Sequence, residues 1–268
     1  MREFFGFGGY NRTPEGFMSW QHLLFVSLLM VLMASSAVAL GLHYRKALPK
    51  KKNNVLIATA FLIDGLELFK IVLLCFRSQD PFHWLLNLPL FLCSIQLIAI
   101  PLAAFSKGRL KAAALDFVCI FGLLGAVCGT YGAGQNYNAY PVLSFDNIVS
   151  GLTHSLSGFA SLYVLIAGIA SMEKRNIGLT FAILSVFCTA AYIANSLIDY
   201  NYMFLRAGDG TPYDILYNLV GGHPVLYPLS VVGLFLIYIC IFYAVYFCAT
   251  HKKATADKSE PTPTAPGM

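Results

Sequence analysis

Long apolar runs dominate the pattern of this sequence, and short polar stretches separate them. A helix needs about 20 mostly apolar residues to cross a bilayer. Seven runs meet or approach that length, at residues 18–42, 55–76, 84–105, 112–131, 148–171, 177–197 and 225–250. A transmembrane β-barrel would instead alternate apolar and polar residues over short strands, and these runs do not alternate. The pattern therefore predicts an all-α polytopic bundle of seven transmembrane helices.

The run at 87–105, NLPLFLCSIQLIAIPLAAF, carries polar or special residues at regular intervals. Pro89, Cys93 and Gln96 follow an i, i+4, i+7 spacing, which places them on one face of a continuous helix. Such a face fits the wall of a polar cavity better than a surface in contact with lipid. We expect the other runs to supply the remaining walls.

Charged residues inside the second run are costly in a membrane and usually face a partner or a water-filled cavity. Glu67 and Lys70 stand three residues apart, so they can pair on one face of a helix. In the fifth run, Ser150, His154 and Ser157 recur at helical spacing on a single face. These stripes favour an interior cavity, although an ion pair or a buried histidine can also be purely structural.

Further polar residues cluster near the same ends of the runs. His22 lies near the start of the first run, Asn195 and Asp199 end the sixth, and Asn201 follows. With a rise of about 1.5 Å per residue, Cys93 and His154 lie about 15 Å and about 10 Å from the predicted outer surface. We therefore expect these two side chains to share a cavity that opens toward the outer leaflet.

Composition agrees with a membrane domain, because 57% of the residues are hydrophobic and only 12% are charged. The seven-run arrangement places thirteen Lys and Arg residues on one side and four on the other. The positive-inside rule then predicts an outside N-terminus and a cytoplasmic C-terminus in a multi-pass cell-membrane protein. The net charge of +5 reflects this topology and does not indicate nucleic-acid binding.

The expected domains are an extracellular aromatic and glycine-rich segment at 1–17, a transmembrane domain at 18–250, and a disordered cytoplasmic tail at 251–268. None of the seven cysteines forms a CxxC pair, which argues against a disulfide framework or a zinc site. Nucleotide-binding, zinc-protease and serine-hydrolase motifs do not occur. We expect no cofactor and no metal, and we expect membrane lipids as the binding partners.

Four pieces of the chain, in order, carry a family resemblance: SWQHLL at 19–24, LPLFLCS at 88–94, LTHSLSG at 152–158 and DYNYMFLR at 199–206. Together they resemble the bacterial YwaF-like integral membrane proteins. Eukaryotic relatives of that family include a transmembrane acyltransferase that forms ether phosphatidylethanolamines by moving an acyl chain between phospholipids. The resemblance implies a Cys and His acyl-transfer centre. Many members are expected to carry LPLHLC, whereas this sequence has Phe91 at the position of the histidine.

Two functional hypotheses follow. In the first, the protein is a phospholipid acyltransferase or acyl hydrolase in which Cys93 is the nucleophile and His154 is its base. Asp199 or Asn195 would then orient the histidine, as the third member of a triad does. In the second, the polar residues bind a small solute for transport, or another ligand, without catalysis. Gln96, Asn201, His22, Glu67 and Lys70 are supporting or binding residues in either case.

Overall fold

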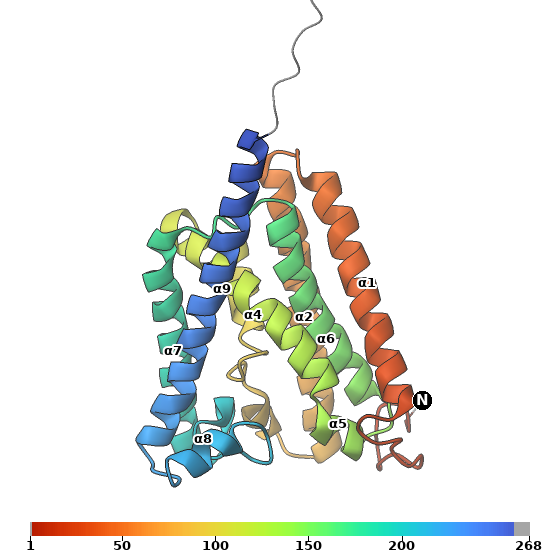
Figure 1. The fold of residues 1–268 in the computed structure, drawn as a ribbon. Coiled ribbons are helices and arrows are strands. Elements are labelled where there is room, and N and C mark those ends of the chain that lie inside the picture. Colours follow the sequence, from red (N-terminus) through yellow and green to blue (C-terminus); the bar gives the residue numbers. More distant parts are fainter. Residues whose placement is uncertain (1, 260–268) are drawn as a thin grey trace, which may run out of the picture.

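The computed structural model describes residues 2–259, with side chains described through residue 250. Helices connected by turns make up this part of the chain, and it contains no strand (Figure 1). The elements are α1 Trp20–Tyr44, α2 Pro49–Ser78, η1 His83–Asn87, α3 Gln96–Phe105, α4 Gly108–Tyr131, α5 Gly134–Ala139, α6 Phe145–Ile166, η2 Lys174–Asn176, α7 Ile177–Ile198, η3 Tyr202–Phe204, α8 Asp214–Leu219 and α9 Leu226–Ser259. The first part of the expected tail, 251–259, continues α9, and 260–268 lie outside the described residues.

Five helical segments of the described chain are long and apolar enough to cross a membrane, so the protein is a multi-pass membrane protein. They are Trp20–Tyr44, Gly108–Ala139, Phe145–Ile166, Lys174–Ile198 and Leu226–Thr250. Two predicted spans fall short for different reasons. The helix α2 is 30 residues long, but Asp64, Glu67 and Lys70 place three charged residues within its apolar stretch. The helix α3 has only ten residues, which is too short to cross alone.

The predicted third span, 84–105, is not one continuous helix. The short 3-10 helix η1 ends at Leu88, whose backbone is extended, and α3 begins only at Gln96. Proline disfavours helical backbone in the preceding residue, so Pro89 explains the break after η1. The Ser94 hydroxyl then accepts the Phe91 N–H at 3.0 Å and donates to the Phe91 carbonyl at 3.1 Å.

This break corrects the face predicted from the i, i+4, i+7 spacing. Pro89 lies in a bend after the extended Leu88, Cys93 in the following turn, and Gln96 at the start of α3. A serine that binds nearby backbone groups competes with helical hydrogen bonds, which stabilises the turn. The three residues therefore do not line one helical face.

The helix α4 lies at the centre of the bundle, with a long buried surface against α6 and further contacts with α1, α3 and α7. Small residues along it allow this close approach. A Cβ at Gly122 would lie 2.7 Å from the Ser157 carbonyl oxygen on α6. Nearby, the Ser161 hydroxyl donates to the Cys119 carbonyl at 2.6 Å. This tight contact fixes the position of α6 against α4.

A buried carboxylate joins α4 to the far side of the bundle. Asp116 accepts hydrogen bonds from the Met172 N–H at 3.0 Å, the Asn176 amide at 2.8 Å and the Tyr243 hydroxyl at 2.8 Å. Its side chain is fully buried, and each carboxylate oxygen has a donor. Because buried charges are tolerated only when they are well paired, this set of bonds holds α4, α7 and α9 in register.

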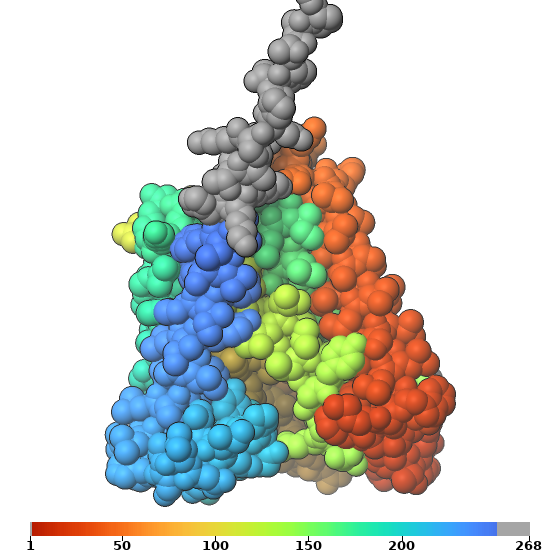
Figure 2. Space-filling model, viewed as in Figure 1, coloured from red at the N-terminus to blue at the C-terminus, as the bar shows by residue number. Residues whose placement is uncertain are grey.

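Residues 2–17 form a compact segment, here called the N-terminal strap, across the ends of α2 and α6. Phe5 packs against Phe69 of α2 and Phe145 of α6, at ring-centroid distances of 6.4 and 5.3 Å. The Val142 N–H donates to the Glu15 carboxylate at 2.8 Å. Figure 2 shows the surface hollowed between α8 and α5, with chain from the 79–95 segment (ochre) at the back of the hollow. This end of the bundle is the predicted outer end.

Candidate functional site

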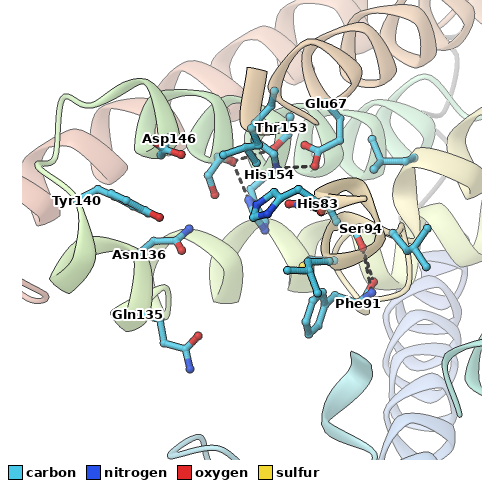
Figure 3. A pocket seen from close by; sticks show the side chains of 18 of the residues that line it. Glu67, His83, Phe91, Ser94, Gln135, Asn136, Tyr140, Asp146, Thr153 and His154 are labelled. Carbon is cyan, nitrogen blue, oxygen red and sulfur yellow. Dashed lines mark hydrogen bonds and ion pairs between the residues drawn. The ribbon is translucent and has the colours of Figure 1, made fainter. Parts of the chain in front are cut away.

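A polar pocket of about 680 Å³ lies near the predicted outer end of the bundle. Side chains from α2, from the broken third span and from α6 line it, and Figure 3 shows several of them pointing into the space. They include Glu67, Lys70, His83, Cys93 and His154. The two residues expected to share a cavity therefore line the same pocket.

Cys93 and His154 reach this pocket from separate elements. Cys93 lies in the turn before α3, and His154 projects from the middle of α6. Both side chains line the pocket wall, and the thiol and the imidazole lie close enough to interact electrostatically. Pairing a thiol with an imidazole is the arrangement by which proteins generate a nucleophilic thiolate.

The orientation of the imidazole follows from its second nitrogen. His154 Nδ1 lies 2.7 Å from the carbonyl oxygen of Ser150, one turn earlier on α6. A carbonyl oxygen can only accept, so Nδ1 carries the proton of the neutral ring. Nε2 is then the nitrogen whose lone pair is available to the Cys93 thiol. A backbone carbonyl thus has the orienting role that was expected of Asp199 or Asn195.

The turn around Cys93 brings backbone donors to the sulfur. The N–H groups of Cys93 and Ser94 lie beside the Cys93 thiol. Neither N–H takes part in a turn or cap hydrogen bond within the described chain. A continuous helix would have committed these groups to carbonyls four residues earlier, so the break in the third span is what frees them.

Two glycines of α4 make room for the pair. A Cβ at Gly129 would overlap the His154 imidazole, and a Cβ at Gly125 would lie 3.3 Å from Cys93 Cα. The Gly125-xxx-Gly129 spacing in the sequence predicts close helix packing only. In the structure, Gly125 lies against Cα and Cβ of Cys93, and Gly129 lies against the His154 imidazole.

Two ion pairs lie along the wall that α2 contributes. Lys70 Nζ lies 2.5 Å from a Glu67 carboxylate oxygen, as the three-residue spacing predicts. Nearer the pocket mouth, the Arg77 guanidinium donates two hydrogen bonds to Asp146 of α6, at 2.7 and 2.8 Å. The sequence does not predict the second pair, because Arg77 lies just outside the apolar run 55–76 and its partner lies 69 positions away in the chain.

The N-terminal strap closes over the second ion pair. The Tyr10 hydroxyl donates to the Asp146 carboxylate at 2.5 Å, and Arg77 also donates to the Phe5 carbonyl at 3.3 Å. Burial and the hydrogen bond to Asp146 raise the pKa of Tyr10 to about 12. The strap therefore holds in place two side chains that line the pocket, Arg77 and Asp146.

Three predicted supporting residues do not line the Cys93 pocket: Asn195 lies in the last turn of α7, and Asp199 and Asn201 lie in the loop that follows. The Asn195 amide binds the backbone of Tyr202 in both directions, with its oxygen accepting at 2.6 Å and its nitrogen donating at 3.0 Å. Asp199 pairs with Arg206, and the Asn201 amide donates to the Ala207 carbonyl at 2.8 Å. These contacts shape the loop, and the expected contact between Asp199 or Asn195 and His154 is absent among the described side chains.

Two further predicted residues are buried beside the pocket without lining it. His22 Nε2 lies 3.1 Å from the Thr130 carbonyl, and its Nδ1 accepts the Met18 N–H at 3.2 Å. These bonds tie the start of α1 to the end of α4. Gln96 is fully buried, and neither atom of its side-chain amide has a hydrogen-bond partner in the described part of the chain.

The seven cysteines are all free thiols, and they differ in their surroundings. Cys119 and Cys188 are buried, the latter with its sulfur 3.7 Å from that of Met203. Cys240 is exposed on α9. Among the described cysteines, only Cys93 lines the polar pocket together with His154. The environment, and not the residue type, distinguishes the candidate nucleophile.

Comparison with known proteins gives one match. The family model of the TMEM164 family, a transmembrane protein family, matches residues 17–250, which include every element from α1 to α8 and most of α9. Neither a curated protein nor a solved structure matches the chain. Because the match spans most of the sequence, the chain belongs to the TMEM164 family.

Proposed function

We propose that this protein is a thiol-dependent acyltransferase or acyl hydrolase that acts on membrane phospholipids. The observation that carries the proposal is the placement of the Cys93 thiol and the His154 imidazole on the wall of one polar pocket in a membrane bundle, close enough to interact. Ser150 fixes the histidine tautomer that a base requires. The sequence resemblance to proteins that move acyl chains between phospholipids favours the same chemistry.

In the first half-reaction, His154 Nε2 takes the thiol proton and Cys93 Sγ attacks the ester carbonyl carbon of a phospholipid. The carbon–oxygen ester bond breaks, and the imidazolium returns its proton to the leaving alkoxide, which departs as a lysophospholipid. The products are an acyl thioester on Cys93 and a neutral imidazole. Splitting the reaction through a covalent intermediate replaces one difficult step by two easier ones.

In the second half-reaction, the hydroxyl of a lysophospholipid attacks the thioester while His154 takes its proton. The carbon–sulfur bond breaks, and the proton passes to the Cys93 thiolate, so that the original state of the protein is restored. Water in place of the hydroxyl gives hydrolysis and releases a fatty acid. Which acceptor enters the pocket decides between a transferase and a hydrolase.

The turn around Cys93 suits the charge that develops during both steps. Acyl transfer passes through a tetrahedral intermediate with a negative oxygen, and preorganised backbone N–H groups stabilise such an oxyanion. The amides of Cys93 and Ser94 lie beside the sulfur and are not used in turn or cap hydrogen bonds of the described chain. The turn also leads into α3, and a helix N-terminus carries a partial positive charge.

We further propose that the chain crosses the cell membrane seven times, with its N-terminus outside. The charges of α2 line the pocket, whereas Leu68 and Phe76 are 63% and 72% exposed, which suits a span with one polar face. Segment 79–95 and α3 together would make the remaining pass. An accessibility tag at the C-terminus should report a cytoplasmic location, and an extracellular signal would contradict this arrangement. The YwaF-like grouping stays a prediction.

The decisive experiment is to trap the thioester. Purified full-length protein in phosphatidylcholine vesicles receives a phospholipid with an alkyne-tagged acyl chain, and mass spectrometry then locates the tag. We expect label on Cys93, none in Cys93→Ala, and labelling slowed about 10²- to 10⁴-fold in His154→Ala, the range typical of a general base. Cys240→Ala serves as the matched control and should label like the wild type.

A folded wild-type protein that acquires no label would contradict catalysis. The pocket would then be a binding or transport site for a small ligand, which is the alternative that the polar residues also allow. Lipid profiling of cells with and without the protein, with Cys93→Ala as control, identifies the acyl donor and acceptor if labelling occurs.

A further inference from the structure

A second cavity, apolar and open to the outside of the bundle, lies against the pocket. This apolar groove has a volume of about 850 Å³, within the range of about 300–1,000 Å³ that is typical of ligand sites. One wall is a stripe of α2, and the other is the irregular segment that follows that helix. Its apolar lining includes Leu68, Ile71, Val72, Phe76, Trp84 and Pro89.

The helix α2 separates the two cavities and presents a different chemistry to each. Glu67, Lys70 and Arg77 line the polar pocket, whereas Leu68 and Val72 line the apolar groove. Both sets recur every three or four residues, so they form two adjacent faces of one helix. The polar and apolar cavities are therefore neighbours along the whole outer half of α2.

Beyond α2, the two cavities meet at the chain segment of Asn87 and Leu88, which lines both of them. The buried Tyr202 fixes this shared wall, because its hydroxyl accepts the Leu88 N–H at 3.1 Å and donates to the Leu85 carbonyl at 2.5 Å. Two consecutive residues thus line both cavities, and Cys93 follows Leu88 by five positions in the chain. An elongated molecule could thus lie in the groove and reach the thiol across this wall.

We infer that the apolar groove binds an acyl chain of the phospholipid whose ester reacts at Cys93. The inference rests on the proposed function and specifies how the substrate lies. A phospholipid joins an apolar chain to a polar ester and headgroup, which matches an apolar groove joined to a charged pocket. The groove also lies on an outward face of α2, where Val72 is 45% exposed, so a chain can enter sideways from the bilayer. The headgroup then lies between the two ion pairs.

Photo-crosslinking tests this placement independently of turnover. The full-length Cys93→Ala protein, in phosphatidylcholine vesicles containing a phospholipid with a diazirine in one acyl chain, is irradiated and its labelled residues are mapped. We expect label concentrated on the groove residues of α2 and on 84–89. Val72→Trp should lower this labelling about tenfold, which corresponds to about 1.4 kcal/mol of lost binding. Val31→Trp is the matched control, because Val31 is 64% exposed on α1, which does not line the groove.

The outcomes separate the groove from the chemistry. Labelling spread evenly over the exposed faces of α1, α2 and α7, and unchanged by Val72→Trp, would overturn the groove. If Val72→Trp unfolds, Leu68→Trp repeats the test at another exposed groove position. Groove labelling without any thioester on Cys93 in the wild-type protein would overturn the proposed function and leave the groove as a lipid site. If folded Val72→Trp loses the groove labelling but still forms the thioester at the wild-type rate, the reacting phospholipid does not bind in the groove. That result would overturn the groove and leave the proposed function standing.

Discussion

Gly129→Ala is the most informative single change, because it alters the candidate site without replacing either Cys93 or His154. The added Cβ would lie 2.8 Å from His154 Cγ and closer still to Cδ2 and Nε2. Ordinary carbon contacts are about 3.5–4.0 Å, and Cδ2 would be only 1.9 Å away, so the imidazole has to move by more than about 1 Å. A shift of about 1 Å in a catalytic group can lower a rate about 10²-fold. We expect Cys93 acylation to fall by about that factor.

The cost to stability should be much smaller. Overpacking a tight contact costs about 1–3 kcal/mol, and replacing a helical glycine by alanine returns about 1 kcal/mol of helix propensity. The net destabilisation is therefore about 0–2 kcal/mol. Thermal unfolding in detergent measures this term, and the rate of Cys93 modification by a thiol reagent reports the displaced imidazole even if the protein has no acyl-transfer activity.

Alanine substitutions at two other glycines serve as comparison variants for Gly129→Ala. A Cβ at Gly125 would meet Cys93 Cα at 3.3 Å, which is tight but tolerable, so Gly125→Ala should have a weaker effect. A Cβ at Gly233 on α9 would meet nothing within 4 Å, so Gly233→Ala should leave Cys93 unchanged and slightly stabilise the protein. Equal Cys93 reactivity in Gly129→Ala and Gly233→Ala would refute the reasoning.

Three further predictions concern the polar contacts of the bundle. Lys70→Met should lower expression and thermal stability more than Glu67→Leu combined with Lys70→Met, because removing one partner of a part-buried ion pair strands the other; equal losses would contradict this. Asp116→Ala should cost about 3 kcal/mol or more in thermal unfolding, because it leaves three buried donors unpaired, and a loss below about 1 kcal/mol would contradict the network. The Tyr10 hydroxyl, with its pKa raised to about 12, should keep its proton while an unfolded tyrosine loses it near pH 10, so its contribution to stability is complete below about pH 10 and is lost as the pH rises through about 12. The difference in tyrosinate absorbance between the wild type and Tyr10→Phe should therefore titrate near pH 12, and a midpoint near 10 would mean that Tyr10 does not hold the strap.

The helical membrane class could be predicted from the sequence because hydrophobic run length depends on local composition alone. The candidate pair could be approached in the same way. Cys93 and His154 both interrupt apolar runs at similar depths, and depth is a coordinate that a membrane sequence does provide. The Glu67–Lys70 pair likewise required only the helical repeat.

The remainder depended on contacts between distant segments. Hydropathy averages the apolar character of residues and does not detect whether the backbone stays helical. The turn around Cys93 therefore could not be predicted from it. The orienting group of His154 is a backbone carbonyl, which no residue identity encodes. Asn195 and Asp199 have residue types suited to a triad, but the loop after α7 uses them for its own backbone and for Arg206.

The broken third span has a consequence for how the protein is made. As sequence, 84–105 is apolar enough to enter a bilayer as a single helix, whereas in the finished bundle its only α-helical part is α3, about 15 Å long. Backbone groups outside a helix cannot face lipid, so the turn at Cys93 can form only once neighbouring helices surround it. Biogenesis then has two stages, in which the segment inserts as a helix and later partly unwinds. The candidate site would thus be the last part of the protein to mature, and the reactivity of Cys93 would report completed assembly.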